Sequence, residues 1–172
     1  TAHDYWPDSY ETNAFFGGNG LQTMMRQLWA LNQSLHTEAF ILPGLMATIV
    51  DDAWLTTLRT PIAAAQQLGV NIPMYSTVAL GVDAVRNMNS IQEVLEEFET
   101  LSVEGVYVLA EHPNGDYLVE DPTWLANVLE LCGGLRIAGK KVLVAYVNHE
   151  LLCLGAAAVN IVAAGTWMNV RM

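Results

Sequence analysis

The sequence predicts a single α/β domain built around a parallel sheet. Short apolar runs rich in β-branched residues alternate with segments of helical periodicity, and this alternation is typical of parallel strands covered by helices. Four of the five runs are almost continuously apolar, as strands buried on both faces are. The chain has 172 residues, which is the length of one domain, so we assign residues 1–172 to one core.

The predicted elements follow one another in a regular order. Residues 1–20 are aromatic, polar and glycine-rich and are expected to be irregular. Apolar residues at helical spacing predict an amphipathic helix over 21–36. Strands and helices then alternate, and the five strands are expected to start near residues 39, 74, 105, 142 and 159.

The segment between the first two strands is helical in composition over residues 51–69. Within it, Thr60 followed by Pro61 forms a favourable N-cap and first-turn pair, and Gly69 is a C-terminal stop signal. Because proline is preferred in the first turn of a helix, a break near Pro61 is expected.

Two further helices carry capping signatures. Ser90 and Glu93 have the spacing of a capping box and predict a helix from residue 91 to about 101. Asp121 and Pro122 open the next helix. A Gly-Gly pair in its middle costs roughly 1 kcal/mol per residue relative to alanine, which indicates close packing or a kink at that point.

The charge balance disfavours a nucleic-acid partner. Lys and Arg total 7 against 18 Asp and Glu, which gives a formal net charge of -11, and the positive residues are scattered along the chain. Such a field repels a phosphate backbone. Charged residues make up only 15% of the chain and hydrophobic residues 52%, so part of the surface is expected to be covered in an oligomer or by further parts of a longer chain.

The sequence indicates a soluble, cytoplasmic protein. The opening residues contain neither the basic nor the apolar segment of a secretory signal, and no apolar run approaches the roughly 18 residues that cross a bilayer. Cys132 and Cys153 lie in apolar helical segments without CxxC spacing. We interpret them as small buried hydrophobic residues in a reducing compartment.

Two architectures fit the alternation, a parallel (β/α) barrel and an open doubly wound sheet. Length favours the open sheet, because an eight-stranded barrel usually needs at least about 200 residues. The last crossover favours the barrel, because barely a dozen residues join the apolar runs 142–147 and 159–164, as between the last two strands of certain TIM barrels. Counting back makes the five strands numbers four to eight. We therefore predict an incomplete TIM barrel, which is part of a longer protein or is closed by a partner chain.

Polar residues follow four of the five predicted strands, and in both architectures ligands bind beyond these strand ends. We expect Glu111 to act as general acid, base or nucleophile, with His112 as its proton-transfer partner and His149 as a further catalytic residue. The residues expected to bind substrate or to stabilise charge are Asp83, Asn114, Asn148, Thr166, Asn169 and Arg171.

The same residues have a simpler interpretation as loop residues. "HPNGD", which follows Glu111, is strong turn chemistry, and polar residues collect at strand ends because loops meet water. No HxH or HExxH spacing occurs among the imidazoles and carboxylates of these loops, so no metal site is predicted, and the sequence identifies no cofactor.

The segment "GKKVLVAYVNHELLCLGAAAVNIVAAGTWMNVR" runs as an apolar strand, a polar turn, a short "LL" helix, a second strand and an Arg-containing loop. This layout resembles the final barrel segment of the tRNA-guanine transglycosylase family. The resemblance implies a TIM barrel and a diverged base-exchange activity. At the positions that match the family's catalytic Asp this chain has Ala163 and Ala164, which carry no nucleophile, and the family's Cys-rich zinc motif is absent from it.

Together these observations predict a barrel-type enzyme, transglycosylase-like, that acts on a small polar or nucleoside-like substrate. Two alternatives remain open. The first is a non-catalytic barrel subunit that is completed by a partner chain, which the low charge content and the missing strands favour. The second is a flavodoxin-like ligand-binding domain with an open sheet.

Overall fold

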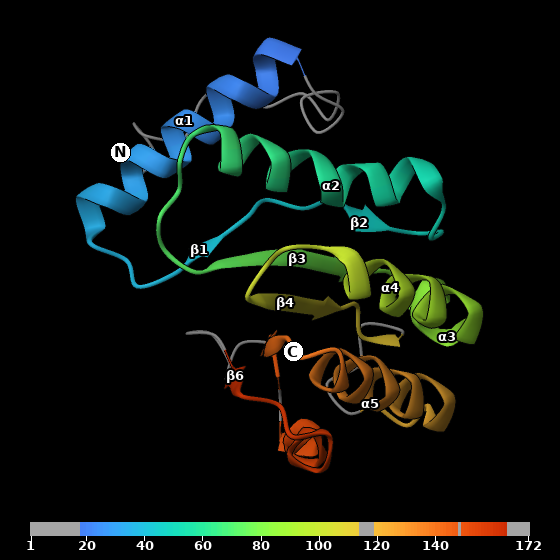
Figure 1. The fold of residues 1–172 in the computed structure, drawn as a ribbon. Helices are drawn as coiled ribbons and strands as arrows, with labels where there is room; N and C mark the ends of the chain where they lie inside the picture. Colours follow the sequence, from blue (N-terminus) through green and yellow to red (C-terminus); the bar gives the residue numbers. More distant parts are fainter. Residues whose placement is uncertain (1–17, 114–118, 148, 165–172) are drawn as a thin grey trace, which may run out of the picture.

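The structure, a computed structural model, describes residues 18–113, 119–147 and 149–164 (Figure 1). None of the helices in these ranges is both long and apolar enough to cross a membrane. In chain order the elements are α1 (Gly18–Leu35), β1 (Phe40–Ile41), β2 (Met46–Ala47), α2 (Asp52–Gln67), β3 (Met74–Leu80), α3 (Val82–Arg86), α4 (Met88–Thr100), β4 (Gly105–Ala110), α5 (Pro122–Ile137), β5 (Lys141–Ala145), the 3-10 helix η3 (His149–Ala157) and β6 (Ile161–Ala163).

All strand pairs are parallel, in the order β1-β3-β4-β5-β6. Strand β1 pairs with the start of β3 and β2 with its end, so β1 and β2 are two parts of one interrupted strand. Pro43, which has no N–H, and Gly44 lie at the interruption, where the Thr77 hydroxyl donates to the Leu42 carbonyl. A Cβ on Gly44 would lie 2.8 Å from the Thr77 Cβ, so this close approach requires glycine. When β1 and β2 are counted as one strand, the five predicted strand positions are confirmed.

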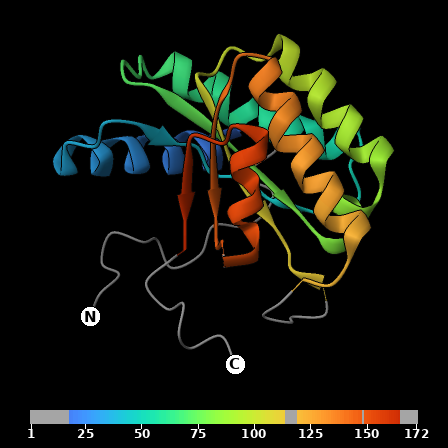
Figure 2. The same cartoon turned by 90° about the horizontal axis from the view of Figure 1, so that it is seen from below.

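The sheet curls into a half-barrel (Figures 1 and 2). The order of the described strands follows the chain without reversal, whereas a doubly wound sheet reverses at a switch point. The alternative prediction of an open doubly wound sheet is therefore wrong for these strands. Right-handed crossovers place successive helices on one face of such a sheet, and Figure 2 shows α4 and α5 together on one side of the strands. Because the strands are parallel, their C-terminal ends share one edge.

The core lies between the sheet and the helices. Phe98 of α4 and Trp124 of α5 are both 0% exposed and belong to this core. Successive strand residues point to opposite faces, so every second strand residue meets the helices. Those residues are Val78, Leu80, Val106, Val108, Val142 and Val144, each at most 2% exposed. The concave face of the half-barrel carries the residues between them.

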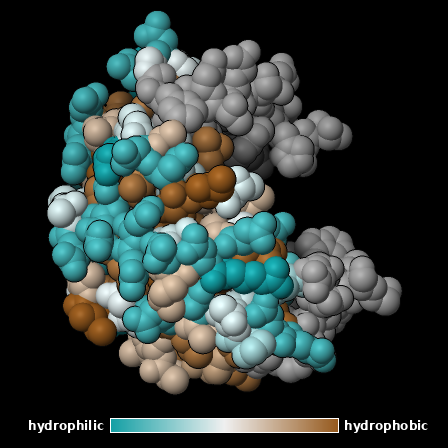
Figure 3. Space-filling view, turned by 90° about the vertical axis from the view of Figure 1, so that its right-hand side faces the viewer, coloured by the Kyte–Doolittle hydropathy of each residue, from teal (hydrophilic) through white to brown (hydrophobic). Residues whose placement is uncertain are grey.

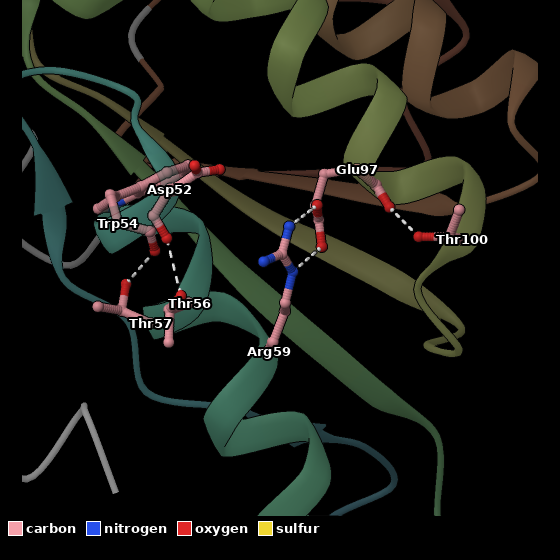
Figure 4. Close-up of polar contacts among 7 residues, drawn as sticks. All are labelled: Asp52, Trp54, Thr56, Thr57, Arg59, Glu97 and Thr100. Atoms are coloured by element: carbon pink, nitrogen blue, oxygen red, sulfur yellow. Dashed lines mark hydrogen bonds and ion pairs between the residues drawn. The ribbon is translucent and has the colours of Figure 1, made fainter.

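Helix α2 runs through Pro61 without interruption, so the predicted break is wrong. The N-cap is Asp51, whose carboxylate accepts an N–H of the first turn at 2.8 Å. Proline removes one helical hydrogen bond, but Pro61 is buried, and tertiary packing of a helix outweighs such local costs. In the preceding turns the hydroxyls of Thr56 and Thr57 donate to carbonyls three or four residues earlier (Figure 4). The hydroxyl of Thr60, the predicted N-cap, likewise donates to the Thr56 carbonyl at 2.6 Å, so Thr60 does not cap a separate helix.

The residues before α4 also differ from the prediction. The N-cap is Asn87, whose side chain accepts the Asn89 N–H at 3.0 Å, and not Ser90, which lies inside the helix and is 5% exposed. The short helix α3, which precedes Asn87, was not predicted. Ser90 and Glu93 match a capping box by spacing, but Asn87 caps the helix three residues earlier, and the apolar face of the longer helix is buried.

An ion pair connects α2 and α4 on the outer surface. Arg59 donates from Nε and Nη2 to the two carboxylate oxygens of Glu97, at 2.7 and 2.5 Å (Figure 4). The Thr100 hydroxyl donates to the Glu97 carbonyl at 3.0 Å. Since the Arg59 side chain is half exposed, the pair stabilises the fold by at most about 1 kcal/mol.

Helix α5 begins after Asp121 as predicted. A Cβ on Gly134 would lie 2.6 Å from the Leu95 side chain, so glycine allows α5 to approach α4, which confirms the predicted close packing. Cys132 is buried, Cys153 is half-buried, and both are free. Burial raises the pKa of Cys132 to about 12, which makes its thiol a poor nucleophile, in agreement with a core role.

Candidate functional site

A hollow of about 450 Å³ opens on the concave face at the C-terminal ends of the strands. Figure 3 faces this edge and shows apolar atoms grouped in the middle of a largely hydrophilic surface. A concave, mostly apolar space with a few polar groups is typical of small-molecule sites. The apolar lining includes Met46, Ala79 and Leu109, and the polar groups are Glu111, His112 and Tyr146.

Strand β4 directs Glu111 to this hollow. Residues at alternate positions of a strand share a face, so Tyr107, Leu109 and Glu111 lie in line on the concave side. The Glu111 N–H donates to the Leu80 carbonyl at 2.9 Å, which continues the β3–β4 pairing one residue past the end of β4. The backbone of Glu111 is therefore as well fixed as the strand itself.

The carboxylate of Glu111 is held by a backbone hydrogen bond. Its Oε2 accepts the N–H of Val82, the first residue of α3, at 3.1 Å. Gly81 permits this approach, since a Cβ there would lie 3.3 Å from Oε2 and 3.1 Å from the Ala47 carbonyl oxygen. No residue in the described part of the chain donates to Oε1. Glu111 is exposed and lines the hollow, so its carboxylate is accessible to a ligand there.

Trp124 supports the residues that follow β4. Its indole N–H donates to the Glu111 carbonyl at 3.0 Å, and its ring meets the His112 ring edge-on, with centroids 5.6 Å apart. The N-cap of α5 places Trp124, because Oδ1 of Asp121 accepts the Trp124 N–H at 3.0 Å. Arg86 binds Oδ2 of Asp121 at 2.6 Å. The Trp124 N–H first, and Arg86 second, lower the pKa of Asp121.

Tyr146 lines the hollow although the sequence did not single it out. The apolar run was expected to continue as a strand to residue 147, but β5 ends at Ala145, and Tyr146 has a φ of 57°. Burial, and then the neighbouring Tyr146 hydroxyl, raise the pKa of Tyr107, so the two phenols lie near each other. The one sequence signal was a tyrosine close to a strand end, which is common because aromatic residues favour strands.

Of the predicted site residues, Glu111 and His112, which are adjacent in the chain, both line the hollow. Asp83 lies in the first turn of α3, is exposed and does not line the hollow. His149 begins η3, but its side chain lies outside the described residues. In residues 18–113, 119–147 and 149–164 no group of three or more His, Cys, Asp or Glu side chains is arranged to hold a metal ion. The remaining predicted site residues also lie outside the described ranges: Asn114, Asn148, Thr166, Asn169 and Arg171.

No protein-family model, curated protein or solved structure matches this chain. A functional argument therefore depends on the geometry of the hollow. The hollow combines a carboxylate oxygen open to a ligand, an imidazole, a phenol and an apolar lining. Such a set can bind a partly apolar small molecule and transfer protons to or from it.

Proposed function

We propose that the chain is part of a TIM-barrel-type enzyme that binds a small polar or nucleoside-like substrate in the hollow. In this proposal the half-barrel supplies strands four to eight, and Glu111 is the acid, base or nucleophile. The observation that carries the proposal is that Glu111, His112 and Tyr146 meet at one apolar hollow from the ends of two neighbouring strands.

The position of the hollow supports this proposal. Enzymes with parallel α/β barrels have their active sites at the C-terminal ends of the strands. Residues attached to strand ends also keep their geometry better than residues on long loops. Glu111 is attached in this way, since its N–H is paired with the Leu80 carbonyl.

The two carboxylate oxygens of Glu111 have different tasks in the proposed mechanism. Oε2 accepts the Val82 N–H and so fixes the orientation of the group. Oε1 accepts a substrate N–H or O–H and, when Glu111 acts as base, takes its proton. His112, whose ring packs against Trp124, is the second group at the hollow that can exchange a proton with the substrate.

Base exchange is the specific form of this proposal, and it comes from the resemblance to the tRNA-guanine transglycosylase family. The reaction breaks the bond between a sugar carbon and one base and forms a bond from the same carbon to another base. Because Ala163 and Ala164 carry no nucleophile, the carboxylate of Glu111 is the group proposed to attack the sugar or to deprotonate the incoming base.

The experiment compares Glu111→Gln with Glu104→Gln. Glu104 stands at the opposite end of β4 and accepts the Met74 N–H at 2.9 Å, so it is a matched control. Binding of adenosine, guanosine, cytidine and uridine is measured by isothermal titration calorimetry. We expect the wild type to bind at least one of them, Glu111→Gln to weaken that binding about tenfold or more, and Glu104→Gln to leave it unchanged.

In both variants the amide oxygen retains an acceptor for the backbone N–H. The free energy of unfolding should therefore fall by less than about 1 kcal/mol in each. Binding to Glu111→Gln at wild-type affinity would remove Glu111 from the site. Absence of binding of all four nucleosides to the wild type would contradict the proposed substrate class.

A non-catalytic barrel subunit completed by another chain is the second candidate, and the exposed sheet edges favour it. On β6, Ile161 is 48% and Val162 is 47% exposed. Neighbouring strand residues point to opposite faces, so β6 is uncovered on both. At the other edge Ile41 is 42% and Met46 55% exposed. Apolar strand edges of this kind invite pairing with another chain.

Size-exclusion chromatography with light scattering tests the second candidate. A monomer of 18.8 kDa that is stable at high concentration would count against it. If the chain associates, Ile161→Lys with Val162→Lys should dissociate the assembly. Ile137→Lys is the control, because Ile137 is 90% exposed at the end of α5 and away from the strand edges.

A further inference from the structure

Tyr146 adopts a backbone conformation that other described non-glycine residues adopt only at helix ends. Its φ of 57° lies in the left-handed region. The other two such residues, His36 and Ala158, each directly follow a helix, and the N–H groups there bond back to helix carbonyls. A left-handed residue is ordinary at a helix C-terminus. Tyr146 follows a strand instead, so its conformation needs another reason.

The conformation forms a bulge that changes which side chain faces the hollow. Along β5, Val144 faces the helices, so a regular strand would direct Tyr146 to the same side. Val147 is found there instead, 5% exposed and part of the core. Its N–H donates to the Ala163 carbonyl at 3.1 Å, while Ala145 is also paired with Ala163. Two residues opposite one are the pattern of a β-bulge, a feature that is frequent beside active sites.

The bulge turns an aromatic ring from the core to the lining of the hollow. Tyr146 is 53% exposed there, in a space that is also lined by Ala79, Leu109 and Glu111. An exposed aromatic face beside an apolar floor favours contact with another flat ring. Glu111 lines the same space, and its Oε1, which no described residue donates to, can accept an N–H or O–H. The geometry therefore suits a flat ring that carries a hydrogen-bond donor.

We propose that Tyr146 sets the specificity of the hollow by packing against a flat ring of the ligand, whose N–H or O–H donor faces Glu111. This inference rests on the proposed function, because it names the part of the substrate that is recognised. Stacking of a base on an aromatic side chain typically changes affinity by roughly tenfold or more. Tyr146 is a binding residue in this inference and takes no part in proton transfer.

The test compares Tyr146→Phe with Tyr146→Leu. Both retain a Cβ in the left-handed conformation, so the backbone strain is the same, but only phenylalanine retains a flat ring. Calorimetric titration with adenosine, guanosine, cytidine and uridine should give affinities within about twofold of wild type for Tyr146→Phe and roughly tenfold or more weaker for Tyr146→Leu. His36→Leu, at a left-handed position after α1, is the control and should bind as the wild type does.

The outcomes separate this inference from the proposed function. If Tyr146→Leu binds nucleosides as the wild type does while Glu111→Gln has lost binding, the role of Tyr146 is overturned and the proposed function stands. If the wild type binds none of the four nucleosides, both fail. In wild-type NMR titrations the amide signals of Glu111 and Val147 should shift with the nucleoside that binds. Shifts confined to residues away from the hollow would also overturn the inference.

Discussion

A glutamate flanks β4 at each end, and the surroundings of the two side chains differ between the two edges of the sheet. Glu104 precedes the strand and Glu111 follows it. Glu104 accepts the N–H of Met74, the first residue of β3, at 2.9 Å, and Glu111 accepts the N–H of Val82, the first residue of α3, at 3.1 Å. The residue type and the kind of hydrogen bond are the same. The surroundings of the two carboxylates are not.

At the N-terminal edge several polar groups bind backbone carbonyls of neighbouring segments. The ammonium of Lys140 donates to the carbonyls of Leu101 and Val103, and Arg136 donates to the Lys140 carbonyl. At the C-terminal edge a hollow stays open beside Glu111. In parallel α/β folds the first edge serves stability and the second serves chemistry. Here the two edges differ in whether a hollow lies beside the glutamate, and not in the type of residue.

The largest expected effect is on the support beneath the C-terminal edge. Trp124→Ala removes a side chain that is 0% exposed and donates to the Glu111 carbonyl, so the free energy of unfolding should fall by about 3 to 5 kcal/mol. Urea denaturation measures this. Trp124→Phe retains most of the volume and should cost distinctly less. Equal losses in the two variants would show that the hydrogen bond, and not packing, holds this edge.

Truncation of the two glutamates tests their equivalence in stability. Glu104→Ala and Glu111→Ala each remove one acceptor of a backbone N–H, so each should lower the free energy of unfolding by about 1 kcal/mol. Thermal or urea unfolding of the two variants gives the comparison. A much larger loss of free energy of unfolding in one variant would show that its carboxylate contributes more to stability than the other.

Replacement of Tyr146, the left-handed residue at the C-terminal edge, by glycine should increase stability slightly. Tyr146→Gly removes the steric cost of a φ of 57°. Glycine also adds entropy to the unfolded chain, which offsets part of this gain, so the free energy of unfolding should rise by only about 0.5 kcal/mol. His36→Gly should give a similar gain. Only Tyr146→Gly should weaken nucleoside binding. A net loss of stability in Tyr146→Gly would mean that ring packing outweighs the strain.

The smallest expected effect concerns pH and Asp121, whose pKa is lowered by the Trp124 N–H first and by Arg86 second. A lowered carboxyl pKa contributes stability that is fully present above the unfolded value of about 3.9 and is lost as pH falls through the folded value. The stability difference between wild type and Asp121→Asn should therefore shrink between about pH 5 and pH 2. Urea unfolding at both pH values measures it. A difference independent of pH would contradict a role for the ionised carboxylate.

Local patterns predicted most of the fold. The apolar runs located all five strand positions, and the alternation with helices predicted that the strands are parallel. The same reasoning predicted that Glu111 and His112 lie at the C-terminal edge of the sheet, because they directly follow a strand. Which edge of the sheet these residues occupy depends only on the direction of the strands. The resemblance of the C-terminal segment to a known family stays a prediction.

Three features were beyond such patterns because they depend on distant contacts. Pro61 is accommodated inside α2 because that helix is buried against its neighbours. Asn87 displaced Ser90 as the cap of α4 because the apolar face of the longer helix is packed. Tyr146 was missed because a single bulge reverses the alternation of side chains after β5.

The order of strands and helices, their direction and the polar character of the strand ends follow from properties of neighbouring residues, namely periodicity, capping and apolar runs. The curl of the sheet, the open hollow and the turn of Tyr146 toward it depend on how segments far apart in the chain pack and pair. Val147 occupies the core and bonds to Ala163, and this long-range pairing is what leaves Tyr146 exposed beside Glu111. No local pattern contains that pairing, because the two segments meet only when the sheet has formed.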